Sequence, residues 1–327
     1  MDVERLMRGR AVKTAFALGV FFTLSLLWLD NLSTRPPTSS SSFLRDPVCK
    51  THMSSSSDQV SSTNWKRSEL YQKMATDLDN NGAAFLDGGE TSQSLKFSDL
   101  FTRDDNKITP VLKPASPAVR ANVLHLQYEY ASKIAKIVEK VLSSHLSQGV
   151  WYQDPQVYHF SLFHASHHLE PVPASETEVQ LESAAVSKVA KSSCPLEIIL
   201  DRVVLTSTGV LLGCWQVLNG TDPATIRQEL RTVLPRAPEK QLYAPEILHT
   251  SIARLIGPLH SSDKVIRSKE EAVSLLKELV RQLNEELCNF QATVRELWFV
   301  EELDVLALAL RGRMKVKRLP LQCSSRD

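Results

Sequence analysis

The feature that most constrains this chain is a His-x-Ser tripeptide that occurs twice, each time in a segment with β-strand character. The first tripeptide contains His159 and Ser161, and the second, 90 residues later, contains His249 and Ser251. Residues i and i+2 of a strand point to the same face, so each histidine is expected to share a face with its serine. The chain must therefore fold so that two strands, distant in sequence, each present an imidazole and a hydroxyl on one side.

The segments around these tripeptides alternate between helical and strand-like periodicity. Apolar residues at steps of three and four predict long helices over 119–146 and 269–290. Asp222 followed by Pro223 predicts the start of another helix, with the aspartate as its cap. The other expected elements are a helix over 183–191, a hairpin formed by strands 197–205 and 210–218, strands over 157–164 and 247–255 that carry the tripeptides, and strands over 292–300, 305–310 and 313–318. This order predicts an α+β fold with two similar lobes, each holding one histidine-bearing strand.

Two such strands suit the cleavage of a phosphodiester. The reaction needs a base to activate the nucleophile and an acid to protonate the leaving oxygen, and imidazole can do either near neutral pH. A hydroxyl two residues along each strand can stabilise the phosphate oxygens by hydrogen bonding, without a metal ion. The alternative is that these histidines are hydrogen-bonded core residues, as strand histidines commonly are.

The two segments, HFSL and HTSIAR, resemble the H-x-[ST]-x motifs of the 2H (two-histidine) phosphoesterase superfamily. The Ala-Arg pair after the second motif is similar to the branch named for bacterial RNA 2′-5′ ligases and cyclic nucleotide phosphodiesterases. The resemblance covers residues 117–319. It implies a bilobal, pseudo-symmetric α+β fold and hydrolysis of 2′,3′-cyclic phosphates or RNA-type phosphodiesters without metal or other cofactor. The implied ligand is a small cyclic phosphate or an RNA end.

The resemblance also implies roles for five residues. His159 and His249 correspond to the acid/base residues, and Ser161 and Ser251 to phosphate-binding residues. Arg254 is a further candidate phosphate contact, although simple strand parity points it away from the cleft unless the strand ends before it.

The N-terminal region predicts a membrane anchor. Residues 14–29 are apolar and uncharged, and four basic residues precede them, which favours a cytosolic N-terminus and a type II single-pass protein of the ER or Golgi. A cleaved signal peptide and a cytosol-facing orientation are the alternatives, and a lumenal domain would allow glycosylation of Asn219. The expected organisation is a cytosolic tail and transmembrane anchor (1–30), a disordered Ser/Pro-rich stem (31–65), a partly ordered connecting segment (66–110), a phosphoesterase domain (111–320) and a tail (321–327).

Charge and cysteine content exclude several classes of protein. With 38 Lys and Arg against 37 Asp and Glu, the net charge is +1, so the chain cannot coat nucleic acid by bulk charge. Five scattered cysteines without a C-x-x-C pair argue against a zinc ribbon or a dense disulfide framework, and their odd number leaves at least one thiol unpaired within the chain or bonded to another molecule.

Other motifs support weaker alternatives. A non-catalytic nucleotide- or RNA-binding module on the same fold is one, and a type II lumenal glycosyltransferase using Asp77 and Asp79 as a D-x-D motif is another. The same aspartates begin an incomplete EF-hand pattern, and an ordinary polar turn is the default interpretation. The remaining features are a His-rich stretch interpreted as a solvated loop (His164, His167, His168), an alternating basic strip interpreted as protection of a sheet edge (Arg311, Arg313, Lys315, Lys317) and aromatic residues that suit base stacking (Trp151, Tyr152, Tyr158, Trp215, Tyr243, Trp298).

Overall fold

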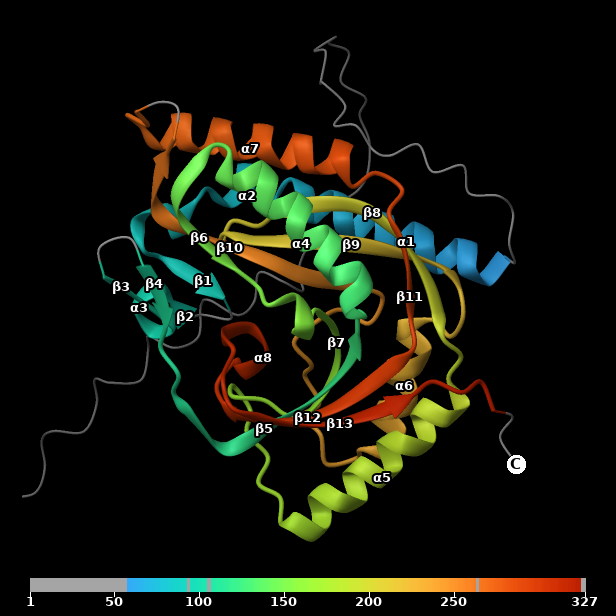
Figure 1. Cartoon of the computed structure of the whole chain (residues 1–327). Coiled ribbons are helices and arrows are strands. Elements are labelled where there is room, and N and C mark those ends of the chain that lie inside the picture. The colour runs from blue at the N-terminus through green and yellow to red at the C-terminus, as the bar shows by residue number, and fades with distance from the viewer. Residues whose placement is uncertain (1–57, 93–94, 105–106, 263–264, 325–327) are drawn as a thin grey trace, which may run out of the picture. The chain divides into compact units, whose positions relative to one another are not determined.

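Two antiparallel sheets carry the two His-x-Ser tripeptides in the computed structural model, which describes residues 58–92, 95–104, 107–262 and 265–324. The five-stranded sheet has the order β11-β8-β9-β10-β6 and holds the second tripeptide, whereas the four-stranded sheet has the order β13-β12-β5-β7 and holds the first (Figure 1). The strands of the first sheet are β6 (Leu146–Tyr152), β8 (Leu196–Leu205), β9 (Val210–Asn219), β10 (His249–Ser261) and β11 (Gln291–Val294), and those of the second are β5 (Pro114–His125), β7 (His159–Ser166), β12 (Glu296–Asp304) and β13 (Met314–Pro320).

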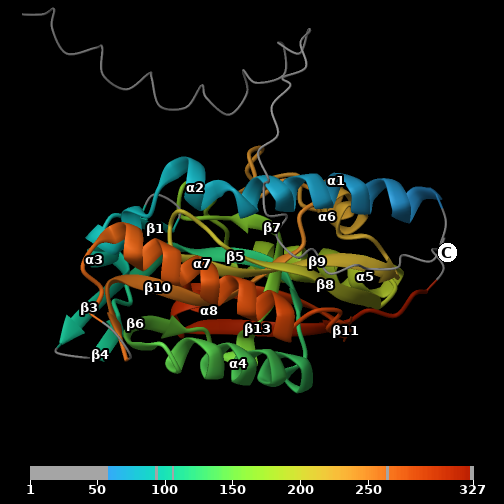
Figure 2. The same ribbon diagram turned by 90° about the horizontal axis from the view of Figure 1, so that it is seen from above.

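Four of the described helices pack on these sheets, and each buries its apolar side against the strands. The helices α4 (Tyr128–Ser143) and α7 (Lys269–Glu286) contact each other and the strands β6 and β8, respectively. On the four-stranded sheet, α5 (Glu176–Ser192) contacts β12 and β13, and α6 (Pro223–Val233) contacts β7 (Figure 2). The remaining short elements are α2 (Asp77–Asn81), η1 (Ala84–Asp87), β1 (Glu90–Ser92), β2 (Leu95–Lys96), α3 (Phe97–Leu100), β3 (Phe101–Asp104), β4 (Lys107–Pro110), η2 (Pro155–Val157) and α8 (Ala307–Leu310).

The helix α1 (Asp58–Ala75) is fixed to the five-stranded sheet by buried polar side chains. Arg67 is fully buried and forms an ion pair with Asp222, the cap of α6, at 2.9 Å. The hydroxyl of Tyr71 accepts a hydrogen bond from the backbone N–H of Leu248, immediately before His249. The expected stem boundary at residue 65 therefore falls inside a helix that contacts β8 and β9.

Most elements of the region around the tripeptides agree with the sequence prediction. The hairpin of β8 and β9 is present, and Gly209 adopts a φ of +79° in its turn, where a side chain would meet the carbonyl oxygen of Leu255. Asp222 accepts a hydrogen bond from the N–H of Ala224 and caps α6, as expected from the Asp-Pro pair. The α+β class is therefore confirmed.

Two predicted elements are wrong. The expected helix over 119–146 is the strand β5 followed by α4. An apolar spacing of four residues fits both periodicities. The polar residues that alternate with Val119, Ala121 and Val123 are Arg120 and Asn122, and both are buried on the second face of β5. The expected strand over 305–310 contains α8, because Leu306 adopts a left-handed φ of 57° and ends the extended run.

The predicted membrane location is also corrected. The apolar run 14–29 that led to it lies outside the described residues, as does most of the predicted stem. Among the helices that the structure describes, none is both long and apolar enough to cross a membrane. This finding contradicts the prediction of a single-pass protein of the secretory pathway, and glycosylation of Asn219, which depended on that location, has no support.

A disulfide bond joins the two sheets at their ends. It links Cys194, just before β8, to Cys323, which follows β13. Cys214 is a buried free thiol, in agreement with the prediction of an unpaired cysteine.

We predict that Arg67→Met lowers the free energy of unfolding by about 3 kcal/mol, because it leaves Asn64, Asp222 and the carbonyl of Glu246 without their buried donor. Urea denaturation measures the change, with Lys66→Met, an exposed neighbour on the same helix, as the control. An equal effect of the two substitutions would show that α1 is not held by Arg67.

Candidate active site

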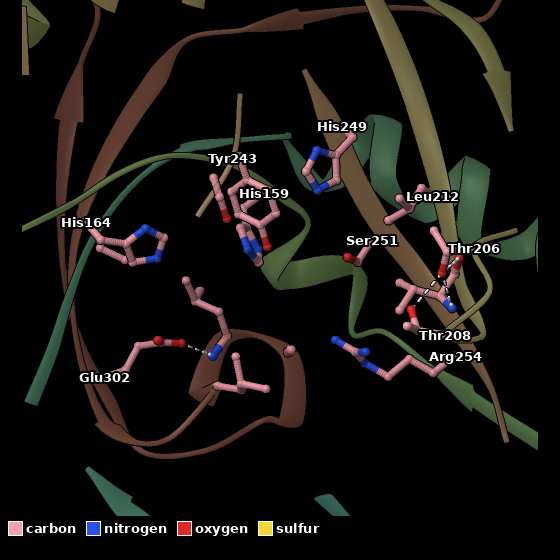
Figure 3. A pocket seen from close by; sticks show the side chains of 16 residues that line it. His159, His164, Thr206, Thr208, Leu212, Tyr243, His249, Ser251, Arg254 and Glu302 are labelled. Carbon is pink, nitrogen blue, oxygen red and sulfur yellow. Dashed lines mark hydrogen bonds between the residues drawn. The ribbon is translucent and has the colours of Figure 1, made fainter. Parts of the chain in front are cut away.

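One cavity, with a volume of about 220 Å³, is lined by residues from both sheets. His159 and Ser161 enter it from β7, and His249, Ser251 and Arg254 enter it from β10 (Figure 3). The fold thus brings together all five residues that the sequence singled out. Two imidazoles from different sheets therefore share one cavity.

A β-bulge explains why Arg254 faces the cavity despite its sequence parity. Ser251 is paired with Leu212 on β9, but Ala253 is paired with the next residue, Leu211, so Ile252 is an extra residue on β10. A single extra residue exchanges the two faces of the strand beyond it. Arg254 therefore returns to the face of Ser251, and burial lowers its pKa to about 10, which leaves the guanidinium charged at neutral pH.

The ring of His159 has a defined tautomer. Its Nδ1 lies 2.8 Å from the carbonyl oxygen of Val157, and because a carbonyl can only accept, Nδ1 carries the proton. The other ring nitrogen, Nε2, is then an acceptor in the neutral imidazole. Burial lowers the pKa of His159 to about 4, with a smaller contribution from His125, so the ring is neutral near pH 7.

His249 is held in an apolar setting beside an aromatic ring. Its ring centroid lies 4.9 Å from that of Tyr243 in an edge-on arrangement. Burial lowers the pKa of His249 to about 3, and the charges of Arg227 and His159 act in the same direction. Both candidate catalytic histidines are therefore uncharged at neutral pH when no ligand is present.

A single buried guanidinium joins the two histidine-bearing segments. Arg227 of α6 donates hydrogen bonds to the carbonyl oxygens of Ser161 and Leu162 on β7, at 2.9 and 3.0 Å. It also donates to the carbonyl oxygens of Ile247, at 2.8 Å, and Pro245, just before β10. Arg227 thus fixes the spacing of the two segments. In the sequence, nothing distinguished it from the other arginines of the chain, so this role was not predicted.

Several residues that line the cavity were not predicted as site residues. Tyr243 is the one residue among the six candidate stacking aromatics that lines it. Trp215 and Tyr158 are core residues, and Trp298 stacks on His125 at 3.8 Å. The lining residues with polar groups that were not predicted as site residues are His164, Glu302, Thr206 and Thr208.

The interpretation of the His-rich stretch as a solvated loop is wrong. β7 continues to Ser166, and His164 and His167 are only 8% and 3% exposed. His167 is hydrogen-bonded to the carbonyl of Lys240 at 3.2 Å and does not line the cavity. Within residues 58–324, apart from the short gaps in the description, no three His, Cys, Asp or Glu side chains are grouped so as to hold a metal ion.

The aspartates of the D-x-D motif make structural contacts and do not line the cavity. Asp77 accepts a hydrogen bond from the N–H of Ser207 at 2.6 Å, which supports the turn between β8 and β9. Asp79 forms an ion pair with Lys277 of α7. Of the basic strip, Lys315 and Lys317 lie on β13, the edge strand of its sheet, whereas Arg311 and Arg313 precede the strand and Arg313 is paired with Asp304 at 2.7 Å. This position agrees with protection of a sheet edge.

Comparison with known proteins gives matches among solved structures alone, since no family model and no curated protein matches the chain. TT0787 of Thermus thermophilus is 14% identical, with a TM-score of 0.42 over 62% of this chain and 98% of that chain. E. coli LigT complexed with NADP+ is 12% identical, with a TM-score of 0.36 over 65% and 99%. Kluyveromyces marxianus Usb1 with uridine monophosphate is 15% identical, with a TM-score of 0.31 over 62% and 97%.

These neighbours belong to the 2H phosphoesterase superfamily, the same one that the two motifs resemble. With TM-scores below 0.5 and identities near 14%, they carry no argument about the chemistry of this chain.

We predict that Arg227→Lys reduces activity at this site at least ~10-fold, because lysine keeps the charge but cannot donate to four carbonyls in a fixed fork. The unfolding free energy should fall by about 2 kcal/mol for the unsatisfied carbonyls. Arg231→Lys is the matched control, since Arg231 lies one turn along α6 and also donates to carbonyls, those of Pro238 and Glu239. If both variants lost activity equally, Arg227 would have no special part in spacing the histidines.

Proposed function

We propose that the protein is a metal-independent phosphodiesterase that acts on 2′,3′-cyclic phosphates or RNA-type phosphodiesters by two-histidine acid/base catalysis. The observation that carries this proposal is that His159 and His249, on strands of different sheets, line one cavity together with Ser161 and Ser251. A base and an acid on separate strands can act on opposite sides of a single phosphorus atom.

The two imidazoles supply the proton transfers. In hydrolysis of a cyclic phosphate, one neutral ring takes a proton from water as the water oxygen attacks phosphorus. The P–O ester bond breaks, and the other ring, protonated, gives its proton to the leaving ribose oxygen. The Nδ1 contact of His159 with Val157 leaves Nε2 as its proton-accepting atom. The two histidines exchange roles when the reaction runs in the reverse direction, so neither is assigned one role.

The serines and the arginine bind the charge of the phosphate. The hydroxyls of Ser161 and Ser251 can donate to its non-bridging oxygens, whose negative charge increases in the transition state. Arg254 lines the same cavity and stays protonated, so it attracts the anion and stabilises that charge further. The proposed ligand is a small cyclic phosphate or an RNA end, and no cofactor takes part in these steps.

A second candidate function is non-catalytic binding of a nucleotide or RNA on the same fold. The observation that favours it is the low pKa of both histidines, about 4 and about 3, which leaves no protonated acid in the ligand-free protein at pH 7. A phosphodiester anion in the cavity opposes this effect, because a nearby negative charge raises the pKa of an imidazole. Turnover measurements separate the two functions.

We expect His159→Ala/His249→Ala to reduce hydrolysis of a nucleoside 2′,3′-cyclic phosphate by at least ~10³-fold, since each proton transfer contributes about 10²–10⁴-fold. The rate of phosphate monoester formation is the measurement. His260→Ala, an exposed histidine of β10, is the control and should retain full activity.

Undiminished hydrolysis in the double variant would reject two-histidine catalysis. EDTA should leave the rate of the wild-type protein unchanged, and a loss of activity with EDTA that added metal restores would contradict the metal-independent part of the proposal.

The pH dependence follows from the lowered pKa values. The acid must be protonated, and a lowered pKa means that its protonated fraction falls as pH rises above about 4, so kcat/KM, which reports the free protein, should be highest at acidic pH and fall toward pH 8. The kcat profile should lie at higher pH, because bound phosphate raises the pKa of the histidines. Steady-state rates from pH 4 to 8 test this, and a kcat/KM that rises from pH 5 to 8 would contradict it.

A further inference from the structure

Both histidine-bearing strands contain the same irregularity at the same position. On β7, Ser161 is paired with Val123, but Phe163 is paired with Asn122, so Leu162 is an extra residue, as Ile252 is on β10. The bulge exchanges the faces of β7 beyond it. His164 therefore faces the cavity three residues after Ser161, in the position that Arg254 holds three residues after Ser251.

His164 lies on the same face of the four-stranded sheet as a buried carboxyl group. Its strand partner is Ala121 of β5, and Glu302 of β12 is paired with Val119, two residues along β5 on the same face. Ala121 lines the cavity between them, and its methyl group leaves space above the sheet. Figure 3 shows His164 and Glu302 on one side of the cavity, whereas Arg254, Thr206 and Thr208 lie on the other.

The two sides differ in charge. Burial is the main cause that lowers the pKa of His164 to about 3, and the neighbouring histidines lower it further, so its ring is neutral near pH 7. Burial raises the pKa of Glu302 to about 7, and one of its oxygens accepts a hydrogen bond from the N–H of Leu308 at 2.7 Å. This side therefore offers hydrogen-bond donors and acceptors without a cation, next to apolar side chains of Leu306 and Leu308. Such a surface does not suit a phosphate, whose charge the carboxyl would repel once ionised.

We propose that His164 and Glu302 form a subsite for one nucleoside of the substrate, and that they bind its ribose hydroxyls or base edge above Ala121. This inference rests on the proposed function, since it places the phosphodiester between the two catalytic histidines. The nucleoside is the part of such a substrate that carries hydrogen-bonding groups and no charge, and its flat base matches the apolar wall beside Leu308. The phosphate group of the bound substrate then faces Arg254 on the opposite side of the cavity.

Isothermal titration calorimetry tests the subsite with two phosphate monoesters. One is adenosine 2′-monophosphate, and the other is phenyl phosphate, which has no nucleoside. Glu302→Leu and His164→Leu should each lower the affinity for adenosine 2′-monophosphate about tenfold, which is the effect of losing one or two hydrogen bonds. The affinity for phenyl phosphate should change less than about twofold. Glu302→Gln should retain most of the affinity, because an amide still donates and accepts. Glu301→Leu, the neighbouring residue on the other face of β12, is the control and should affect neither ligand selectively.

The inference is overturned if the leucine variants weaken both ligands equally, if they weaken neither, or if the wild-type protein does not bind adenosine 2′-monophosphate. Thermal unfolding of each variant confirms that it is folded, and His164→Leu and Glu302→Gln keep the test decisive if Glu302→Leu does not fold. Hydrolysis is measured separately. Selective nucleotide binding by a protein that hydrolyses no phosphodiester would reject the proposed function and leave the subsite in place.

Discussion

The donation of hydrogen bonds by the buried guanidinium of Arg227 to four carbonyl oxygens is the interaction on which the site depends. The two His-x-Ser strands belong to different sheets, so no backbone hydrogen bond of a common sheet fixes their distance. Arg227 replaces those hydrogen bonds, because its fork reaches Ser161 and Leu162 on one side and Ile247 on the other. Its charge is also felt by His249, whose pKa it lowers. Position and protonation of the histidines therefore depend on the same side chain.

In the proposed function, burial of the two histidines links substrate binding to catalysis. In the free protein, both rings lose more solvation energy on protonation than their surroundings return, so both are neutral. A phosphodiester adds a negative charge beside both rings, and it does so only when it occupies the cavity. The acid thus becomes available in the complex, where its proton is needed, and Arg254 competes with the histidines for the same negative charge. The balance between these two cationic groups determines how far the pKa of the acid rises.

The sequence predicted the elements whose signals are local. The turn with Gly209, the cap Asp222 and the tripeptide strands depend on neighbouring residues, and all were placed correctly. The strand β5 was not, because its apolar spacing of four residues also fits a helix, and the polar residues of its second face, Arg120 and Asn122, are buried rather than exposed. The burial of His164 was not predicted for a similar reason. A His-rich stretch is polar in sequence, and its burial depends on the two sheets that cover it in the fold.

In the site, the alternation of strand faces predicts the side chains within each tripeptide but not those beyond it. Within each tripeptide the period of two holds, so His159 with Ser161 and His249 with Ser251 could be predicted from the sequence. Beyond each serine, one extra residue exchanges the faces, and nothing in the letters HFSLFH or HTSIAR marks that residue as a bulge. The partner strand decides it, because the register of β5 or β9 determines which residue is left unpaired. The side chains that distinguish the two ends of the cavity, His164 and Arg254, are thus set by tertiary pairing.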